Sequence, residues 1–136
     1  MKSSFQNKSI DELSSLIKDY PGFPAPGIIF RDINPLLRDY FQDTLIALKD
    51  AISEKKWNSI DVIAGIESRG FILAAALAAI TNKGFVPIRK LGKLPGKVES
   101  AKYNLEYGSD QLEMSPGNGN VLLVDDVLAT GGTLNA

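Results

Sequence analysis

The chain has 136 residues with 15 basic and 16 acidic side chains, and this near-balance of charge argues against a protein that binds nucleic acid through a basic face. Its length allows one domain with a hydrophobic core, and a hydrophobic content of 44% excludes a disordered chain. The sequence contains neither cysteine nor histidine, which excludes disulfides, thiolate zinc sites and histidine as a general base.

The beginning of the chain carries no apolar stretch of signal-peptide length. The longest apolar run, Phe71 to Ile80, has about half the length that a membrane span needs. We therefore expect a soluble, cytoplasmic protein that makes no contact with a membrane.

The first predicted element is a helix over Ser9–Asp19. Ser9 and Glu12 match the capping-box pattern, and the apolar residues that follow recur at helical spacing. The next segment, Tyr20–Gly27, has three prolines and two glycines, so no regular element is expected there. It is either a simple turn or a rigid loop that presents Ile28–Asp32.

The middle of the chain predicts a helix, a strand, a second helix and a second strand. Apolar residues at helical spacing predict a helix over roughly residues 40–56. The β-branched run Ile60–Ile66 predicts a buried strand, and the alanine-rich segment Phe71–Thr81 predicts a helix packed closely on a sheet. Phe85–Arg89 predicts the next strand, in which Pro87 indicates an edge or a bulge.

The last part of the chain begins with a basic, glycine-rich segment, Lys90–Lys97, which is either a mobile surface loop or a lid that reaches an anion. Val98–Met114 alternates in polarity like an exposed hairpin, and a turn over Ser115–Asn120 follows. Val121–Val124 is fully apolar and predicts another strand. Strands that alternate with helices in this order predict an α/β fold with a parallel sheet.

A candidate ligand site follows that last strand. Asp125 and Asp126 stand at its carboxyl end, where ligands bind in open parallel sheets. The glycines and threonines of Thr130–Thr133 then open a helix, so that backbone N–H groups and the helix dipole favour a phosphate. No lysine follows as in a Walker A loop. The carboxylates suit ribose hydroxyls, a developing positive charge or water-bound Mg²⁺. An ordinary strand–helix turn is the weaker alternative, because acids, glycines and threonines occur together.

A second candidate anion site lies at Glu67–Gly70, where another strand ends and a helix opens. Arg69 is suited to a pyrophosphate, since its guanidinium offers paired donors, but it also fits an exposed surface position. Three further cations lie at and after the end of the next predicted strand, namely Arg89, Lys90 and Lys93. The alternative interpretation is that these side chains are solvated charges on a surface loop.

Five segments together resemble a known family. VLLVDDVLATGGT is similar to the phosphoribosyl-pyrophosphate motif of the type I phosphoribosyltransferases. FPAPGIIFRDI, GIESRGF, FVPIRKLGKLPG and YNLEYG resemble the adenine-using members of that family. The resemblance runs from about Ile10 to Ala136. It implies the type I phosphoribosyltransferase fold, a mostly parallel twisted sheet flanked by helices, with a flexible hairpin loop.

The resemblance also implies a single domain over residues 1–136, with a small N-terminal hood over about 1–35 and a core over about 36–136. Thr133–Ala136 supplies one helical turn where the family continues further. We therefore expect that the C-terminal part of the family's fold is missing from this chain.

The resemblance implies transfer of a phosphoribosyl group from phosphoribosyl pyrophosphate to adenine, giving AMP and pyrophosphate, in a homodimer. Mg²⁺ is the implied cofactor, carried by the substrate near the two aspartates without direct protein ligands. The implied catalytic residues are Glu106, Tyr107, Asp125 and Asp126. The implied 5′-phosphate loop is Ala129, Thr130, Gly131, Gly132 and Thr133. The implied pyrophosphate residues are Ser68, Arg69, Arg89, Lys90 and Lys93. The implied adenine residues are Ile29, Phe30 and Arg31.

Within this set, Glu106 is the acid–base candidate at the purine and the segment 29–31 contacts adenine through its backbone. Lys90 is expected to reach the neighbouring subunit. Two other functions stay open. One is a phosphoribosyltransferase for another base, and the other is a regulator that senses phosphoribosyl pyrophosphate and binds DNA, although no DNA-binding module is visible.

Overall fold

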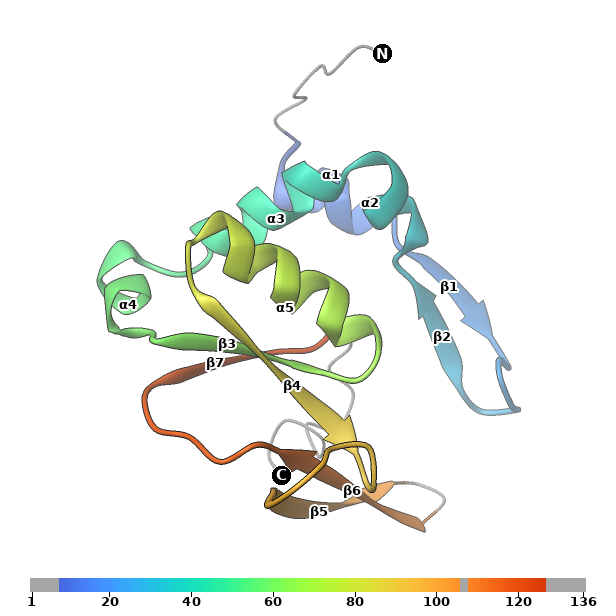
Figure 1. The fold of residues 1–136 in the computed structure, drawn as a ribbon. Helices are drawn as coiled ribbons and strands as arrows, with labels where there is room; N and C mark the ends of the chain where they lie inside the picture. The colour runs from blue at the N-terminus through green and yellow to red at the C-terminus, as the bar shows by residue number, and fades with distance from the viewer. Residues whose placement is uncertain (1–7, 106–107, 127–136) are drawn as a thin grey trace. The chain divides into compact units, whose positions relative to one another are not determined.

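The computed structural model describes residues 8–105 and 108–126. The chain forms two compact units, Met1–Ser53 and Glu54–Ala136, which are described separately. Figure 1 shows the elements of both units with the labels used below.

In its described part, from residue 8 onward, the first unit contains three short helices and a two-stranded antiparallel sheet. In chain order these elements are α1 (Ile10–Ser15), β1 (Lys18–Pro21), β2 (Ile29–Asp32), α2 (Asn34–Asp39) and α3 (Phe41–Asp50). The apolar residues that lie buried in this part of the chain are Leu13, Ile33, Leu36 and Leu45.

The predicted start of α1 is confirmed, but its predicted end is wrong. Ser9 is the N-cap residue and forms a reciprocal capping box with Glu12. The helix ends at Ser15, because the residues that follow pair with β2 as the strand β1. Tyr20 and Pro21 belong to that strand, so the expectation that the proline-rich stretch holds no regular element is also wrong at its beginning.

The helix expected over residues 40–56 is interrupted. α3 ends at Asp50, and a separate helix, α4, begins at Glu54 in the second unit. α2, which the sequence reasoning missed, has a proline in its first turn, and the side chain of Asp32 accepts a hydrogen bond from the Asn34 N–H at its start.

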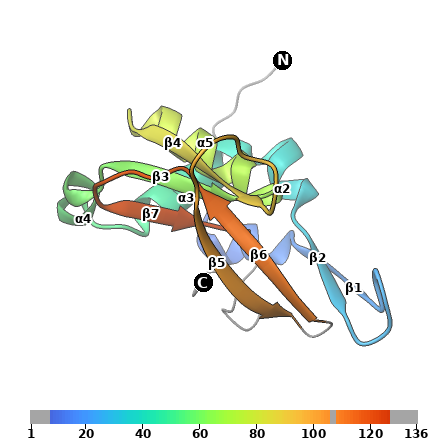
Figure 2. The same ribbon diagram turned by 60° about the horizontal axis from the view of Figure 1, so that its bottom comes forward.

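The second unit is a five-stranded sheet with helices. Its elements are α4 (Glu54–Ser59), β3 (Val62–Ile66), α5 (Arg69–Ile80), β4 (Gly84–Lys90), β5 (Glu99–Leu105), β6 (Gly108–Met114) and β7 (Val121–Val124). The strand order is β5-β6-β4-β3-β7. β3 pairs in parallel with β4 and β7, as expected, while β6 pairs antiparallel with β4 and β5 and makes the sheet mixed (Figures 1 and 2).

Register brings the ends of two parallel strands to one edge. Val62 of β3 lies opposite Val121 of β7, and Gly65 lies opposite Val124. The residues that follow these strands therefore leave the sheet at the same edge, where open parallel sheets bind ligands. On the other side of β3, Gly65 lies opposite Pro87 of β4. Pro87 is tolerated because β6 pairs with β4 through Arg89 and Lys90, beyond the proline.

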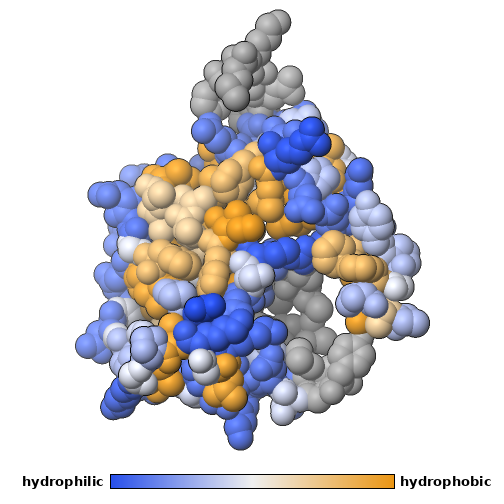
Figure 3. All heavy atoms as spheres, turned by 45° about the vertical axis from the view of Figure 1, so that its right-hand side comes forward, coloured by the Kyte–Doolittle hydropathy of each residue, from blue (hydrophilic) through white to orange (hydrophobic). Residues whose placement is uncertain are grey.

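α5 packs against β3, β4 and β7, so the predicted close packing on the sheet is confirmed, but the helix is buried on one face only. A Cβ atom on Gly65 would lie 2.6 Å from the Ala74 Cβ and 2.8 Å from the Gly70 carbonyl oxygen, so the helix approaches the strand too closely for any side chain there. Ile63, Ala64, Ala74 and Leu77 are buried, whereas Ile72 on α5 is 44% exposed. Apolar and hydrophilic areas both reach the surface drawn in Figure 3.

The hairpin of β5 and β6 is confirmed, but it is buried on one face rather than exposed. Tyr103 and Leu112 pack with Ala64, Ile66 and Ile88 in one apolar cluster. The long curved strands of the hairpin are visible in Figure 2. Within the described residues, no helix has the length and apolar character needed to cross a lipid bilayer.

Candidate active site

The candidate site begins where β7 ends and α5 starts. Arg69 is the first residue of α5, and its Nε atom forms an ion pair with Oδ2 of Asp126. The Asp126 side chain is 9% exposed and that of Arg69 is 32% exposed. The contact is an ion pair without hydrogen-bond geometry, and Oδ2 has no hydrogen-bond partner within the described residues. The structure therefore places a cation and a largely buried anion together at the ligand-binding edge.

Asp125 lies beside this pair and has an unusual proton affinity. Burial, and then the side chain of the neighbouring Asp126, raise its pKa to about 6. Arg69 opposes the shift, since a cation favours the ionised form. One Asp125 oxygen accepts a hydrogen bond of 2.9 Å from the Asp126 N–H. A carboxyl group with this pKa changes charge near neutral pH, as groups at functional sites often do.

Gly70 allows α5 to start against the end of β7. A Cβ atom on Gly70 would lie 3.0 Å from the Val124 carbonyl oxygen and 3.2 Å from Oδ1 of Asp125. These distances are tighter than ordinary contacts, so a larger residue would push the helix or the carboxylate away. The glycine thus brings the first turn of α5 close to the acidic pair.

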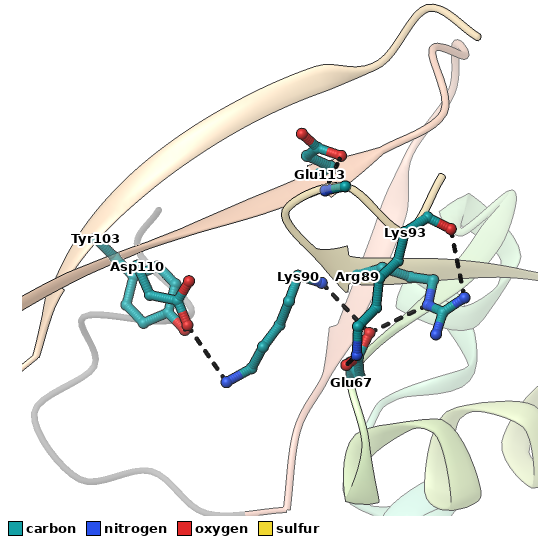
Figure 4. Close-up of polar contacts among 8 residues, drawn as sticks. Glu67, Arg89, Lys90, Lys93, Tyr103, Asp110 and Glu113 are labelled. Carbon is teal, nitrogen blue, oxygen red and sulfur yellow. Dashed lines mark hydrogen bonds and ion pairs between the residues drawn. The ribbon is translucent and has the colours of Figure 1, made fainter. Parts of the chain in front are cut away.

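A second group of charges surrounds Glu67, which follows β3 (Figure 4). Arg89 Nε donates a hydrogen bond of 3.1 Å to Oε1 of Glu67, and Lys93 forms an ion pair with Oε2. The Lys90 N–H also donates to Oε1, at 3.3 Å. The side chain of Glu67 is 10% exposed. The cations hold its pKa below the usual range, Lys93 most of all.

A third group links β4 to the hairpin (Figure 4). Lys90 Nζ lies 3.3 Å from Oδ2 of Asp110, and the hydroxyl of Tyr103 donates to the same oxygen at 3.2 Å. Burial, and then the charge of Asp110, raises the pKa of Tyr103. The pKa of Asp110 is lowered, first by the Gln111 N–H that donates to it.

The pyrophosphate residues expected from the sequence thus divide into two places. Arg69 lies with Asp126, while Arg89 and Lys93 meet at Glu67. Ser68 is the N-cap residue of α5, and its peptide bond with Glu67 is cis. The idea that the lysines are merely solvated loop charge is wrong for Lys93, because its ion pair with Glu67 fixes it.

The predicted adenine residues belong to the first unit. Ile29, Phe30 and Arg31 lie on β2, and Gly22 N–H donates to the Ile28 carbonyl just beyond this segment. Hydrogen-bonded pairs alternate in an antiparallel ladder, so the backbone groups of Ile29 and Arg31 point away from β1. The Arg31 guanidinium lies 3.6 Å from Asp19, and the ring of Phe30 meets Phe23 edge to face.

Seven predicted site residues lie outside the described residues. These are Glu106, Tyr107, Ala129, Thr130, Gly131, Gly132 and Thr133. Their roles stay predictions.

Sequence reasoning missed three carboxylates that hold the predicted cations and their loop. Glu67 and Asp110 pair with the cations, and Glu113, which is 6% exposed, accepts a hydrogen bond of 3.3 Å from the Gly92 N–H. The signal for Glu67 was its position at a strand end directly before Ser68 and Arg69. The other two give no local signal, because their partners are more than ten residues away.

The geometry offers a cation beside two acids at one strand end, and two cations around one acid at the next. The first group suits a sugar whose carbon becomes positive while an anion leaves, and the second suits the anion itself. Among the described residues, no three acidic side chains gather as a protein-ligated metal ion would require.

Comparison with known proteins agrees with this chemistry. Residues 40–136 match the family model of the phosphoribosyl transferase domain. An adenine phosphoribosyltransferase of Bdellovibrio bacteriovorus is 54% identical over 125 residues, which are 92% of this chain and 75% of that protein.

Solved structures give the same result. The adenine phosphoribosyltransferase of Saccharomyces cerevisiae, in complex with an imino-altritol bisphosphate and adenine, is 43% identical with a TM-score of 0.83, over 91% of this chain and 74% of that one. The Trypanosoma brucei enzyme, in complex with AMP, pyrophosphate and ribose-5-phosphate, is 27% identical with a TM-score of 0.74, over 91% and 57%. The fold is the type I phosphoribosyltransferase fold, and the chain belongs to the adenine phosphoribosyltransferase family.

Proposed function

We propose that this protein transfers the 5-phosphoribosyl group of phosphoribosyl pyrophosphate to adenine, which gives AMP and pyrophosphate and serves purine salvage. The observation that carries the proposal is the cluster of Arg69, Asp125 and Asp126 where β7 ends and α5 begins. Relatives with the same fold are named for this activity, and two of them were solved with its base or its products.

The reaction separates charge, and the cluster is suited to that. The bond between ribose C1 and the pyrophosphate oxygen breaks, adenine N9 forms the new bond to C1, and N9 loses its proton. The ribose carbon becomes positive meanwhile, which the carboxylates of Asp125 and Asp126 favour. The guanidinium of Arg69 favours the departing anion. Because Asp126 is already paired with Arg69, we assign the closer role at the sugar to Asp125.

The base is proposed to bind at the outer edge of β2. The backbone groups of Ile29 and Arg31 point away from β1, toward the outer edge of β2. Backbone donors and acceptors of a strand edge are suited to hydrogen bonds with the ring nitrogens of a flat heterocycle. Glu106 is the proposed acid–base group at the purine, with Tyr107 beside it, and the segment 129–133 is the proposed 5′-phosphate loop.

Mg²⁺ is the proposed cofactor, and the residues present fit it as a companion of the substrate. Asp125 offers the hard oxygen donors that Mg²⁺ prefers, while Asp126 has one oxygen turned to Arg69. When bound, Mg²⁺ would offset the charge of the pyrophosphate and so ease its departure. A homodimer, in which Lys90 reaches the neighbouring subunit, and a cytoplasmic location stay predictions.

The test is Mg²⁺-dependent conversion of phosphoribosyl pyrophosphate, with adenine and hypoxanthine supplied in parallel reactions. We expect AMP and pyrophosphate in equal amounts from adenine and little product from hypoxanthine. Equal use of both bases would refute the assignment to adenine. A protein that binds phosphoribosyl pyrophosphate and yet forms no nucleotide from either base would favour a sensing role instead.

A further inference from the structure

Glu67 connects two segments that both belong to the proposed pyrophosphate site. It directly precedes Ser68 and Arg69 in the chain, so its backbone is part of the turn between β3 and α5. Its side chain points to the other segment, where it contacts Arg89 near the end of β4 and Lys93 in the turn that follows (Figure 4). One carboxylate therefore links the two strand ends.

The contacts of Glu67 use both of its oxygens. Oε1 accepts from Nε of Arg89 at 3.1 Å and from the Lys90 N–H at 3.3 Å, and Oε2 pairs with Lys93. The guanidinium of Arg89 also reaches the Lys93 carbonyl oxygen at 3.5 Å. Two cations therefore surround one anion in this group, which consists of Arg89, Glu67 and Lys93. The group carries one positive charge in excess.

Burial strengthens these contacts. The side chain of Glu67 is 10% exposed, whereas those of Arg89 and Lys93 are 36% and 46% exposed. The anion is therefore the inner member, and the cations keep part of their surface toward solvent. Charge-assisted hydrogen bonds to a partly dehydrated carboxylate are stronger than those at an open surface.

Glu113 of β6 holds the same turn from the opposite strand. It is 6% exposed, lies opposite Arg89 in the β4–β6 register, and accepts a hydrogen bond from the Gly92 N–H. The turn after β4 is thus fixed by a side-chain contact on Lys93 and by a backbone contact on Gly92. Glu67, which follows β3, and Glu113 of β6 thus contact two consecutive residues of this turn, Lys93 and Gly92.

We propose that Glu67 is a positioning residue for pyrophosphate, because its carboxylate holds Arg89 and Lys93 at the strand ends in the arrangement that the anion meets. This inference rests on the proposed function. Glu67 itself is not expected to touch pyrophosphate, since like charges repel. Its contribution is to keep two long, flexible cationic side chains ordered before the ligand arrives, which removes that ordering from the cost of binding.

The alternative, in which Glu67 occupies the anion site, predicts the opposite change in pyrophosphate affinity. If Glu67 merely occupied the anion site, pyrophosphate would have to displace it, and removing its charge would tighten pyrophosphate binding. Under the positioning role, removing the charge weakens binding. The direction of the change in affinity therefore distinguishes the two.

The first experiment measures the contact without any catalysis. Lys93 is acetylated with an N-hydroxysuccinimide ester and followed by mass spectrometry, with Lys97 and Lys102 of the same molecule as internal references. An ammonium group held against a carboxylate is less accessible to the reagent and reacts slowly. We expect Glu67→Gln to speed the labelling of Lys93 by about threefold or more, and Glu67→Asp to restore part of the protection. Unchanged labelling of Lys93 would overturn the proposal.

The second experiment measures pyrophosphate binding in the presence of Mg²⁺ by calorimetry, together with steady-state kinetics. We expect Glu67→Gln to weaken pyrophosphate binding and raise the KM for phosphoribosyl pyrophosphate by about tenfold, while the KM for adenine stays unchanged. Glu99→Gln on the exposed part of β5 removes the same charge and is the matched control. Glu67→Asp should recover part of the affinity.

The outcomes separate this inference from the proposed function. Unchanged or tighter pyrophosphate binding in Glu67→Gln overturns the positioning role even if the wild-type protein makes AMP. If the wild-type protein makes no AMP, the proposed function is refuted. If Glu67→Gln nevertheless weakens pyrophosphate binding and removes the protection of Lys93, the positioning role is supported. Circular dichroism confirms that each variant is folded before it is compared.

Discussion

Arg69 and Asp126 form an ion pair that joins the first residue of α5 to the second residue after β7. The pair crosses from one strand end to the next, so it ties together the two loops that the sequence assigns to pyrophosphate and to ribose. Its members lie 57 positions apart in the numbering, as the difference between 126 and 69 gives. Their meeting depends on the parallel pairing of β3 with β7.

Replacing Arg69 by Ala should lower both activity and stability. The substitution leaves the largely buried Asp126 without its counter-charge, so we expect a loss of about 1–2 kcal/mol in the free energy of unfolding, less than for a fully buried pair because Arg69 is partly exposed. Urea unfolding measures this. The double variant Arg69→Ala with Asp126→Asn should recover part of the stability, and strict additivity of the two changes would contradict the coupling. The kcat/KM for phosphoribosyl pyrophosphate should fall by about a hundredfold.

Asp125 should make stability depend on pH in the direction opposite to that of most carboxylates. Its pKa is about 6 in the folded protein and near the ordinary 3.8 when unfolded. Between these values the folded state binds more protons through this group, so its contribution to the free energy of unfolding falls as the pH rises and stays lost above about pH 6. Burial and Asp126 cause the shift, while Arg69 limits it.

Asp125→Asn tests this dependence, because the amide cannot ionise. Relative to the wild type, the variant should be more stable near pH 8 than near pH 4, by on the order of 1 kcal/mol after allowance for partial exposure. Urea unfolding at several pH values gives the difference. A stability difference between the two proteins that does not change with pH would contradict the raised pKa.

Gly70→Ala should be unfavourable although alanine is the better helix former. The new methyl group would meet the Val124 carbonyl oxygen at 3.0 Å and Oδ1 of Asp125 at 3.2 Å. We expect a loss of about 1–2 kcal/mol in stability and a higher KM for phosphoribosyl pyrophosphate, because Asp125 must move. Gly84→Ala is the control, since its methyl group would meet Val62 at an ordinary 3.6 Å. Equal effects of the two substitutions would refute the steric argument.

Asp110→Asn should act on Tyr103 more than on stability. The pair of Asp110 with the half-exposed Lys90 contributes little to stability, because solvent screens it. Loss of the Asp110 charge should bring the pKa of Tyr103 part of the way down, while the effect of burial remains. Ultraviolet titration of tyrosine ionisation, with Tyr103→Phe subtracted to isolate this residue, measures the change. An unchanged Tyr103 titration would show that burial accounts for the whole shift.

Arg31→Pro tests whether adenine is read by the backbone of β2. The backbone N–H of Arg31 points away from β1, so proline removes it without breaking the β1–β2 ladder. Arg31→Ala is the matched control, because it loses the ion pair with Asp19 as the proline variant does but retains the backbone N–H. We expect the KM for adenine to rise about tenfold more in the proline variant than in the alanine variant. Equal values would assign the role to the side chain.

The parts of the fold that the sequence predicts well are those set by local pattern. The β-branched run before Glu67 and the apolar helix after it are found nearly where they were expected, since a continuous apolar run of this length leaves few alternatives. The end of α1 was missed because helical spacing continues through Leu16 and Ile17, while pairing with β2 decides the structure from Lys18 onward. Local propensity yields there to a partner about ten residues away.

In the candidate site, too, the features set by local pattern were predicted and those set by distant pairing were not. The cations were found from their position after strand ends, but their carboxylate partners were not. Glu113 meets Gly92 across the β4–β6 pairing, and Lys90 meets Asp110 across the same strands. A sequence motif records which residues follow one another, whereas these contacts depend on which strands become neighbours.

The close approach of α5 to β3 at Gly65 also has a mechanical consequence. Strand and helix touch there through backbone and a single methyl group, without long side chains that bend to absorb a displacement. The two elements therefore behave as one stiff unit, and Ser68 and Arg69 lie where they join. A bulkier residue at the contact of Gly65 with Ala74, more than one helical turn away from Arg69, would shift α5 relative to β3. It would thereby displace the anion-binding residues without touching them.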